Sequence, residues 1–286
     1  LFMNDDEDWS SCYPLSNGNN PSATTDGEAV FLLMNTVVDD VESASIASIG
    51  SIDGNINATF IAALPTAFIK GDITFNAGSL DVALIEKESR SVYYLQLGLD
   101  GALETNPTIL SNGCDGDRLE SVTLNGNRCV FFIDDNSIKM ARCLGDPSSW
   151  VCHTVHTIDE GSMTSASIAI SGPELRIAYV VLNEGELSVW ALDCDPQGNA
   201  DANARLSTPG LDAGSPVIIS TCPGSFSCVY VEEHHGSQEL FLRFDFDFSI
   251  VDVTRMPEFI DSLEGWMFAN GNASRAALKG RMNAIL

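Results

Sequence analysis

The feature that most constrains the fold is a block of strand-like stretches that recurs along the chain. In residues 161–210, four short stretches rich in apolar, β-branched and aromatic residues are separated by turn residues such as Gly172, Pro173 and Gly185. β-branched and aromatic residues favour extended strands, whereas glycine and proline interrupt them. This segment therefore predicts four short antiparallel strands joined by turns.

The same block recurs in neighbouring parts of the sequence. Three stretches match as second strands, each with an aromatic residue at its fourth position: Arg128–Ile133, Arg176–Val181 and Ser227–Glu232. Each is followed by a polar turn and a third apolar stretch: Ile138–Cys143, Leu187–Leu192 and Leu240–Phe246. Internal repeats of this length are typical of propellers and solenoids, in which every repeat is one supersecondary unit.

The repeat resembles those of secreted propeller proteins, which have the loose pattern SLAL…G.P.IAYYD…G.L..A.C. Here the pattern is present as SIAI, GPELRIAYV and GELSVWAL, and as SIKMARC in the preceding repeat. The resemblance covers residues 71–255. The chain has no Asp-box of the sialidase kind (S-x-D-x-G-x-T-W), and no WD dipeptide ends a strand. The resemblance therefore implies an extracellular propeller scaffold and no particular activity.

We expect an all-β chain folded as a six-bladed β-propeller, with four-stranded blades of about 45–50 residues. Two regions are predicted: a polar, acidic segment at residues 1–26 and a propeller domain at residues 27–286. The last repeat begins near Gly265 and holds about half a blade. Because an unpaired strand edge recruits another strand, residues 1–26 are expected to complete this blade, in their own chain or in a neighbouring subunit. The second arrangement predicts self-association through the terminal strands, and head-to-tail contacts that do not close extend into a fibre.

The charge of the chain excludes several classes of partner. Fourteen basic residues against forty acidic ones give a net charge of −26. Such a surface repels nucleic acid and anionic lipid, and we read it as an adaptation to solubility in a salty or extracellular medium. The longest apolar runs, such as Val30–Met34 and Phe60–Leu64, are too short to cross a bilayer, so membrane insertion is not expected.

The cysteines indicate an oxidising compartment. There are eight, an even number, and no C-x-x-C pair that would indicate a zinc site. Cys143 and Cys152 flank a short turn, as do Cys222 and Cys228, so we predict a disulfide within each pair. The sequence leaves the pairing of four cysteines open: Cys12, Cys114, Cys129 and Cys194.

Two further signals favour secretion. Asn57 and Asn272 lie in N-x-S/T sequons and are expected to be exposed and glycosylated if the source is eukaryotic. The chain begins at Leu1 without a basic segment or a long apolar run, so we expect that any signal peptide has been removed. A secreted, disulfide-bonded protein is predicted.

One loop partly resembles a calcium-binding loop. Oxygen-bearing side chains recur with Gly198 at the sixth position: Asp193, Asp195, Asn199 and Asp201. The glutamate expected at the twelfth position is absent, since residue 204 is Ala. The segment is therefore either a calcium site or a polar connection between strands, and no other cofactor is expected.

No motif of a known catalytic class is present. The sequence lacks a G-x-S-x-G elbow, a P-loop and an H-E-x-x-H helix. Glycoside hydrolysis requires two carboxylates, but forty acidic residues make any one pair uninformative. We therefore predict a non-enzymatic extracellular structural or adhesive module. The alternative is a carbohydrate-binding, lectin-like or carbohydrate-active propeller, whose ligands would be glycans.

Overall fold

The computed structural model describes residues 19–244, except 39–40, 53–54, 65, 117, 196, 223–224 and 235. These residues form nineteen β-strands and no helix. All of the strands belong to one compact unit, residues 16–249. No helix in the described part of the chain is long and apolar enough to cross a membrane.

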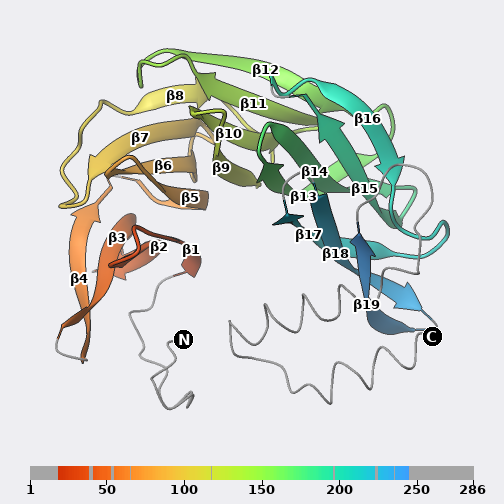
Figure 1. Ribbon diagram of the computed structural model, residues 1–286, viewed down its shortest axis with the longest axis horizontal. Coiled ribbons are helices and arrows are strands. Elements are labelled where there is room, and N and C mark those ends of the chain that lie inside the picture. The colour runs from red at the N-terminus through yellow and green to blue at the C-terminus, as the bar shows by residue number, and fades with distance from the viewer. Residues whose placement is uncertain are drawn as a thin grey trace. The chain divides into compact units, whose positions relative to one another are not determined.

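The strands form five antiparallel sheets (Figure 1). The first sheet contains β1 (Asn19–Thr25), β2 (Val30–Val38), β3 (Val41–Ile52) and β4 (Asn55–Ala63). The second contains β5 (Phe68–Asn76), β6 (Ser79–Glu86), β7 (Val92–Gly98) and β8 (Thr108–Ser111). The third contains β9 (Leu119–Leu124), β10 (Asn127–Asp134), β11 (Ser137–Cys143) and β12 (Trp150–Thr157).

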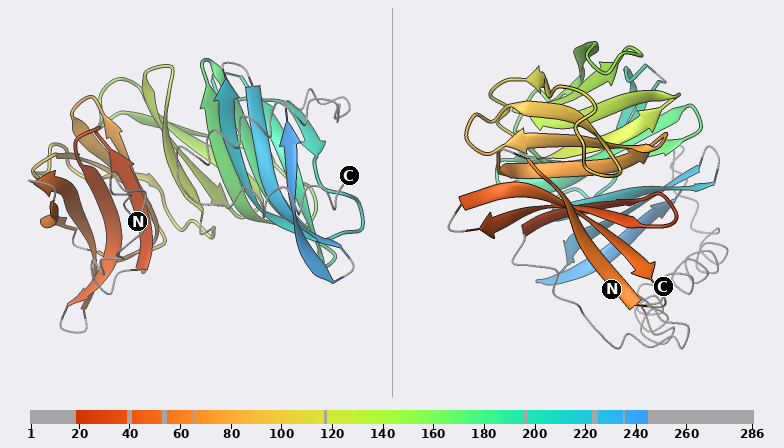
Figure 2. Two further views of the ribbon diagram at one scale, coloured as in Figure 1. Left: turned by 60° about the horizontal axis from the view of Figure 1, so that its bottom comes forward. Right: turned by 90° about the vertical axis from the view of Figure 1, so that its left-hand side faces the viewer.

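The remaining two sheets repeat this pattern. The fourth contains β13 (Ser162–Ser171), β14 (Glu174–Asn183), β15 (Glu186–Cys194) and β16 (Ala200–Arg205). The fifth, within the described residues, contains β17 (Ala213–Cys222), β18 (Ser225–His234) and β19 (Ser237–Phe244). In every sheet the spatial order of the strands follows the sequence, and the sheets are twisted (Figure 2).

Tight turns explain why consecutive strands pair with each other. Asn125 and Gly126 both have positive φ (50° and 75°), as do Glu184 and Gly185 (50° and 88°). Two such residues form the type I′ turn, whose twist matches that of the flanking strands. The register follows directly, since Asn127 lies opposite Leu124 and Asn183 lies opposite Glu186.

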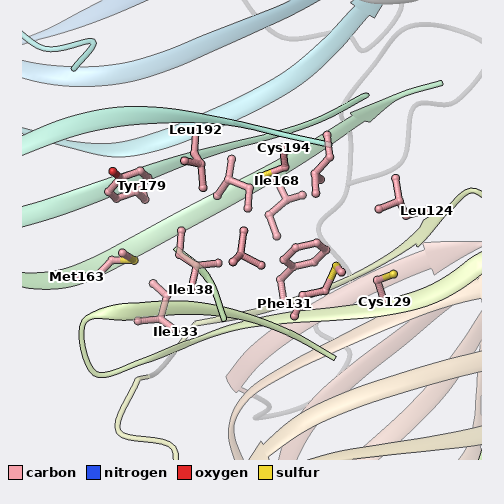
Figure 3. Close-up of a cluster of buried hydrophobic side chains, with 14 of the residues drawn as sticks. Leu124, Cys129, Phe131, Ile133, Ile138, Met163, Ile168, Tyr179, Leu192 and Cys194 are labelled. Carbon is pink, nitrogen blue, oxygen red and sulfur yellow. The ribbon is translucent and has the colours of Figure 1, made fainter. Parts of the chain in front are cut away.

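The core lies between neighbouring sheets. One cluster joins the third and fourth sheets, and Figure 3 shows Phe131, Ile138, Met163, Ile168 and Tyr179 among its members. Central strands are buried on both faces, which explains the nearly continuous apolar run of β6. Burying each large apolar side chain contributes about 1.5–3 kcal/mol to stability, so the packing of sheet on sheet holds the repeats together.

The first strands of successive sheets pack beside one another. β1 contacts β5, β5 contacts β9, β9 contacts β13, and β13 contacts β17 (Figure 1). Four-stranded antiparallel sheets that adjoin through their first strands are the blades of a propeller. This arrangement brings five segments, widely separated in sequence, to one place.

The predicted all-β, repeated four-stranded architecture is confirmed, and the matched second and third strands correspond to β10, β14 and β18 and to β11, β15 and β19. The predicted N-terminal segment, residues 1–26, overlaps the first sheet. Asn19–Thr25 pairs with β2 and is the first strand of the first sheet, because its Ala23 and Thr24 continue the ladder opposite Leu32 and Phe31. The proposed sixth blade at 265–286 and the terminal strand exchange fall outside the described residues.

Candidate functional site

A polar cavity of about 580 Å³ lies among the first strands of the sheets. Residues of β1, β5, β9, β13 and β17 line it, together with Arg118, which directly precedes β9. Its charged residues are Lys70, Asp72, Arg118 and Glu120. Its hydroxyl-bearing residues are Thr24, Thr74, Ser121, Ser165 and Ser167. Polar side chains from several repeats therefore line one cavity.

One position in each of the first strands β1, β5, β9 and β13 links its sheet to the next. At this position a side-chain oxygen accepts a hydrogen bond from a backbone N–H of the following first strand. The four bonds run from Ile73 to Ser22 (3.3 Å), from Ser121 to Asp72 (2.7 Å), from Ile168 to Glu120 (3.1 Å) and from Ile218 to Ser167 (3.3 Å). Donor and acceptor are 48 to 51 residues apart, so these acceptors, which we call the bridging positions, are equivalent sites of the repeat.

Asp72 is held by three hydrogen bonds from two neighbouring sheets. The Ser22 hydroxyl donates to its Oδ1 (2.6 Å), and the backbone N–H and hydroxyl of Ser121 donate to its Oδ2 (2.7 and 2.8 Å). Hydrogen bonds to a carboxylate are stronger than those between neutral groups. The orientation of this carboxylate is therefore fixed by the first and third sheets.

Glu120 is a partly buried carboxyl whose proton affinity is unusually high. Burial, followed by the nearby charge of Asp72, raises the pKa of Glu120 from 4.5 to about 7. The N–H of Ile168 and the charge of Lys70 act in the opposite direction and are outweighed. Glu120 also borders a small space lined by apolar side chains, among them Phe131 and Ile138. A carboxyl with a pKa of about 7 is protonated in about half of the molecules at neutral pH, so it can serve as a general acid.

Each of these two carboxyls is preceded by a base two residues earlier. The sequence reads Lys70-Gly71-Asp72 in β5 and Arg118-Leu119-Glu120 at the start of β9. Residues two apart in a strand lie on the same face. In the fourth sheet the equivalent positions are Ser165 and Ser167. The cavity therefore has a charged side, from the second and third sheets, and a hydroxyl side.

The structure does not form the predicted Cys143–Cys152 disulfide. Trp150 lies opposite Cys143 and Ala141 lies opposite Cys152, so the register offsets the two cysteines, and both are free thiols. Cys228 is also a free thiol, buried in the core opposite Ile218. Two cysteines on either side of a turn form a disulfide only if the strand register places them close to each other. The side chain of Cys222 lies outside the described residues, as does Cys12, while three unassigned cysteines are free: Cys114, Cys129 and Cys194.

The candidate calcium ligands are used in other interactions. Asp193 forms an ion pair with Arg176 across the β14–β15 ladder. Asp195 accepts hydrogen bonds from the backbone N–H groups of Gln197 and Asn199 and from the Asn199 side chain, which closes the loop on itself. Within the described residues no group of three or more His, Cys, Asp or Glu side chains could hold a metal ion. Asp193 is therefore part of an ion pair and Asp195 is part of a turn. Asp201 does not join them in a cluster that could bind a metal ion.

The predicted glycosylation sites remain predictions. Asn57 lies in β4, and its side chain is outside the described residues, as is Asn272.

Known proteins resemble this chain in fold and only weakly in sequence. No protein-family model matches the sequence, and no curated protein matches it. An α-L-arabinanase from Penicillium chrysogenum, solved in complex with arabinobiose, has a TM-score of 0.54 at 10% identity, over 77% of this chain and 80% of that one. An endo-arabinase from Bacteroides thetaiotaomicron has a TM-score of 0.48 at 11% identity, over 78% and 92% of the two chains. The catalytic domain of a GH62 α-L-arabinofuranosidase from Coprinopsis cinerea gives 0.46 at 10%, over 82% and 92%.

The arabinanase likeness confirms the β-propeller fold, and it corrects two predictions about function. A non-enzymatic structural or adhesive module was expected because no catalytic motif is present. The arabinanase that shares the fold is instead an enzyme that acts on a carbohydrate, and this chain has a polar cavity containing Asp72 and Glu120. The prediction of a non-enzymatic module is therefore wrong, and the carbohydrate alternative is better supported. Self-association through the terminal strands stays a prediction, because those strands lie outside the described residues. The resemblance to secreted propeller repeats holds for the fold.

Sequence reasoning missed both carboxyls, although a signal for them exists. Asp72 and Glu120 occupy equivalent places in consecutive repeats, near Gly71 and Gly116, and each follows a basic residue by two positions. Aligning the repeats on their first strands, rather than on their aromatic second strands, would have singled them out among the forty acidic residues.

Proposed function

We propose that this protein is a carbohydrate-active β-propeller that hydrolyses glycosidic bonds in the cavity among its first strands. The observation that carries the proposal is the pair formed by Glu120, with a pKa of about 7, and Asp72, whose charge contributes to that value. Glycoside hydrolysis requires two carboxyls in unlike environments, and here one has a raised pKa while the other is held as a hydrogen-bond acceptor.

The two carboxyls have different roles. Glu120 donates its proton to the glycosidic oxygen as the bond between that oxygen and the anomeric carbon breaks. Asp72 faces the positive charge that develops on the sugar ring, and its hydrogen bonds with Ser22 and Ser121 prevent it from turning away. Water then adds to the anomeric carbon and gives up one proton to the Glu120 carboxylate, which restores the acid. General acid catalysis of this kind contributes about 10²–10⁴-fold to the rate.

The hydroxyl side of the cavity suits a sugar. Thr24, Ser165 and Ser167 line it, and each hydroxyl can both donate and accept. A ligand site of this class combines a preformed concave surface with a few convergent polar groups. The acidic composition and the Asn57 sequon further support an extracellular location, where polymeric glycans are accessible.

The test is a hydrolysis assay on a panel of aryl glycosides and plant and microbial polysaccharides, including arabinan and xylan. We expect Glu120→Gln and Asp72→Asn to lower kcat/KM at least about 100-fold. Because the acid must carry its proton, wild-type activity should decline above pH 7, the pKa region of Glu120.

Glu232→Gln is a matched control for these variants. Glu232 is also a buried carboxyl that accepts a backbone N–H, from Thr208 at 2.6 Å, but it does not line the cavity. Its substitution should preserve activity in the folded protein. Full activity of Glu120→Gln would contradict the proposal, and binding of a glycan without any turnover by the wild type would favour a lectin-like role.

A further inference from the structure

We propose that the substrate of this cavity is an anionic glycan, whose acidic group is bound by Lys70 and Arg118. This inference rests on the proposed function and narrows its substrate class. The chemistry that Lys70 and Arg118 recognise is an oxyanion on a sugar, either the carboxylate of a uronic acid or a sulfate ester.

The first argument is position. Lys70 and Arg118 each precede a bridging carboxyl by two residues, and both line the cavity. Two residues of a strand span about 6.6 Å, so the basic residues form a layer beside the carboxyl layer. A sugar whose glycosidic bond lies at Asp72 and Glu120 would extend its ring or its neighbouring ring into the basic layer. An acidic substituent there would meet two cations.

The second argument is that no carboxylate of the described residues forms an ion pair with Lys70. Its ammonium forms no hydrogen bond or ion pair with the described residues, although its side chain is only partly exposed. Five other basic side chains are engaged with carboxylates: Lys87, Arg128, Lys139, Arg176 and Arg205. The nearby Asp72 accepts its hydrogen bonds from Ser22 and Ser121 instead.

The third argument is electrostatic. A chain with a net charge of −26 repels an anionic polymer, so a site for one needs a local concentration of positive charge. Two of only fourteen basic residues line this one cavity beside two acidic ones, so the cavity carries a net charge of +1 when Glu120 is protonated. An arginine fork matches the geometry of a carboxylate and a lysine adds a point charge, and together they would hold an acidic group in one orientation.

Lys70 also works against the acid that catalysis needs. Its charge lowers the pKa of Glu120, which opposes the effect of burial. A neutral sugar would leave this charge in place, whereas an anionic sugar would offset it when bound. A cation beside a general acid is therefore better suited to an anionic substrate than to a neutral one.

The competing explanation is that Lys70 and Arg118 only screen Asp72 and Glu120 from each other. It predicts that replacing Lys70 alters the hydrolysis of acidic and neutral glycans equally. Our proposal predicts a change in the ratio of kcat/KM for acidic glycans to kcat/KM for neutral ones, since only an acidic glycan has a negative charge that Lys70 can bind.

The experiment compares kcat/KM for acidic oligosaccharides with that for the same oligosaccharides after carboxyl reduction or desulfation. In Lys70→Met we expect the acidic-to-neutral ratio to fall at least tenfold, whereas Lys70→Arg should retain most of it. Lys87→Met, which removes an exposed lysine paired with Glu42 outside the cavity, is the control and should keep the wild-type ratio. Uronate and sulfate substrates, assayed separately, identify which oxyanion is bound. An unchanged ratio in Lys70→Met would overturn the proposal.

A binding measurement separates this inference from the proposed hydrolysis. Calorimetric titration of Glu120→Gln with the acidic oligosaccharides should give binding that Lys70→Met weakens at least tenfold in the double variant. Lys70-dependent binding without turnover by the wild type would support the anionic site and reject hydrolysis. Turnover of neutral glycans with no preference for acidic ones would support hydrolysis and reject the anionic site. Thermal unfolding of each variant confirms that the protein tested is folded.

Discussion

Glu120→Gln should inactivate the protein and yet stabilise it at alkaline pH. The pKa of Glu120 is about 7 in the folded protein, against an ordinary value of 4.5. Between these values the folded state binds more protons than the unfolded state, so stability falls as the pH rises through this window. Above pH 7 the charged carboxylate carries its full desolvation penalty, and below pH 4.5 the penalty is absent. Glutamine has no charge to desolvate, and its carbonyl can still accept the Ile168 N–H.

The size of the effect follows from the pKa. One unit corresponds to about 1.36 kcal/mol, so a rise from 4.5 to about 7 sets an upper limit of about 3 kcal/mol. Glu120 borders an open cavity, and solvent reduces this figure to roughly 1–3 kcal/mol. For a domain of this size, each kcal/mol shifts Tm by about 2–4 °C. We therefore expect Glu120→Gln to unfold a few degrees above the wild type at pH 8 and close to it at pH 5.

Thermal unfolding followed by near-ultraviolet circular dichroism at pH 5, 6, 7 and 8 measures this difference. Forty acidic residues make the stability of every variant depend on pH, so the relevant quantity is the Tm of the variant minus that of the wild type. A difference that stays constant from pH 5 to 8, or a variant less stable than the wild type at pH 8, would refute the reasoning. Glu120 would then be an ordinary structural carboxyl.

Two further predictions concern the scaffold. Gly116→Ala should destabilise the protein by at least about 2 kcal/mol, because the new Cβ would lie 2.0 Å from the backbone oxygen of Ile133. Gly50→Ala, which meets nothing within 4 Å, should be neutral or slightly stabilising in chemical denaturation. Iodoacetamide should label the exposed Cys152 in the native protein before the buried Cys228, whose pKa burial raises to about 12. Peptide mapping that finds Cys152 protected until reduction would restore the disulfide with Cys143.

Local sequence patterns were sufficient to predict the repeated strands. The second and third strands of the later repeats were found because strand alternation and turn residues act over a few neighbouring positions. Local patterns did not identify the partner of Asn19–Thr25, which was expected to complete the last blade and instead pairs with β2. That segment forms a strand because Val30–Val38 offers it a partner and because Ser22 and Thr24 bond to β5.

The cysteines show a similar limit. Cys143 and Cys152 flank a turn, but strand register decides which residues face each other, and the register here includes an irregularity between Ile138 and Lys139. A sequence gives the length of a connection and leaves the register open.

By itself the sequence determined the composition of each blade, its period and the acidity of the surface, because these depend on neighbouring residues and on simple sums of charge. Only the tertiary structure decided that Asp72 and Glu120 belong to one site. They come from different repeats, and they meet because β5 and β9 pack side by side as first strands of adjoining sheets. The raised pKa of Glu120 likewise comes from burial and from the charge of Asp72, and neither exists until the sheets have assembled.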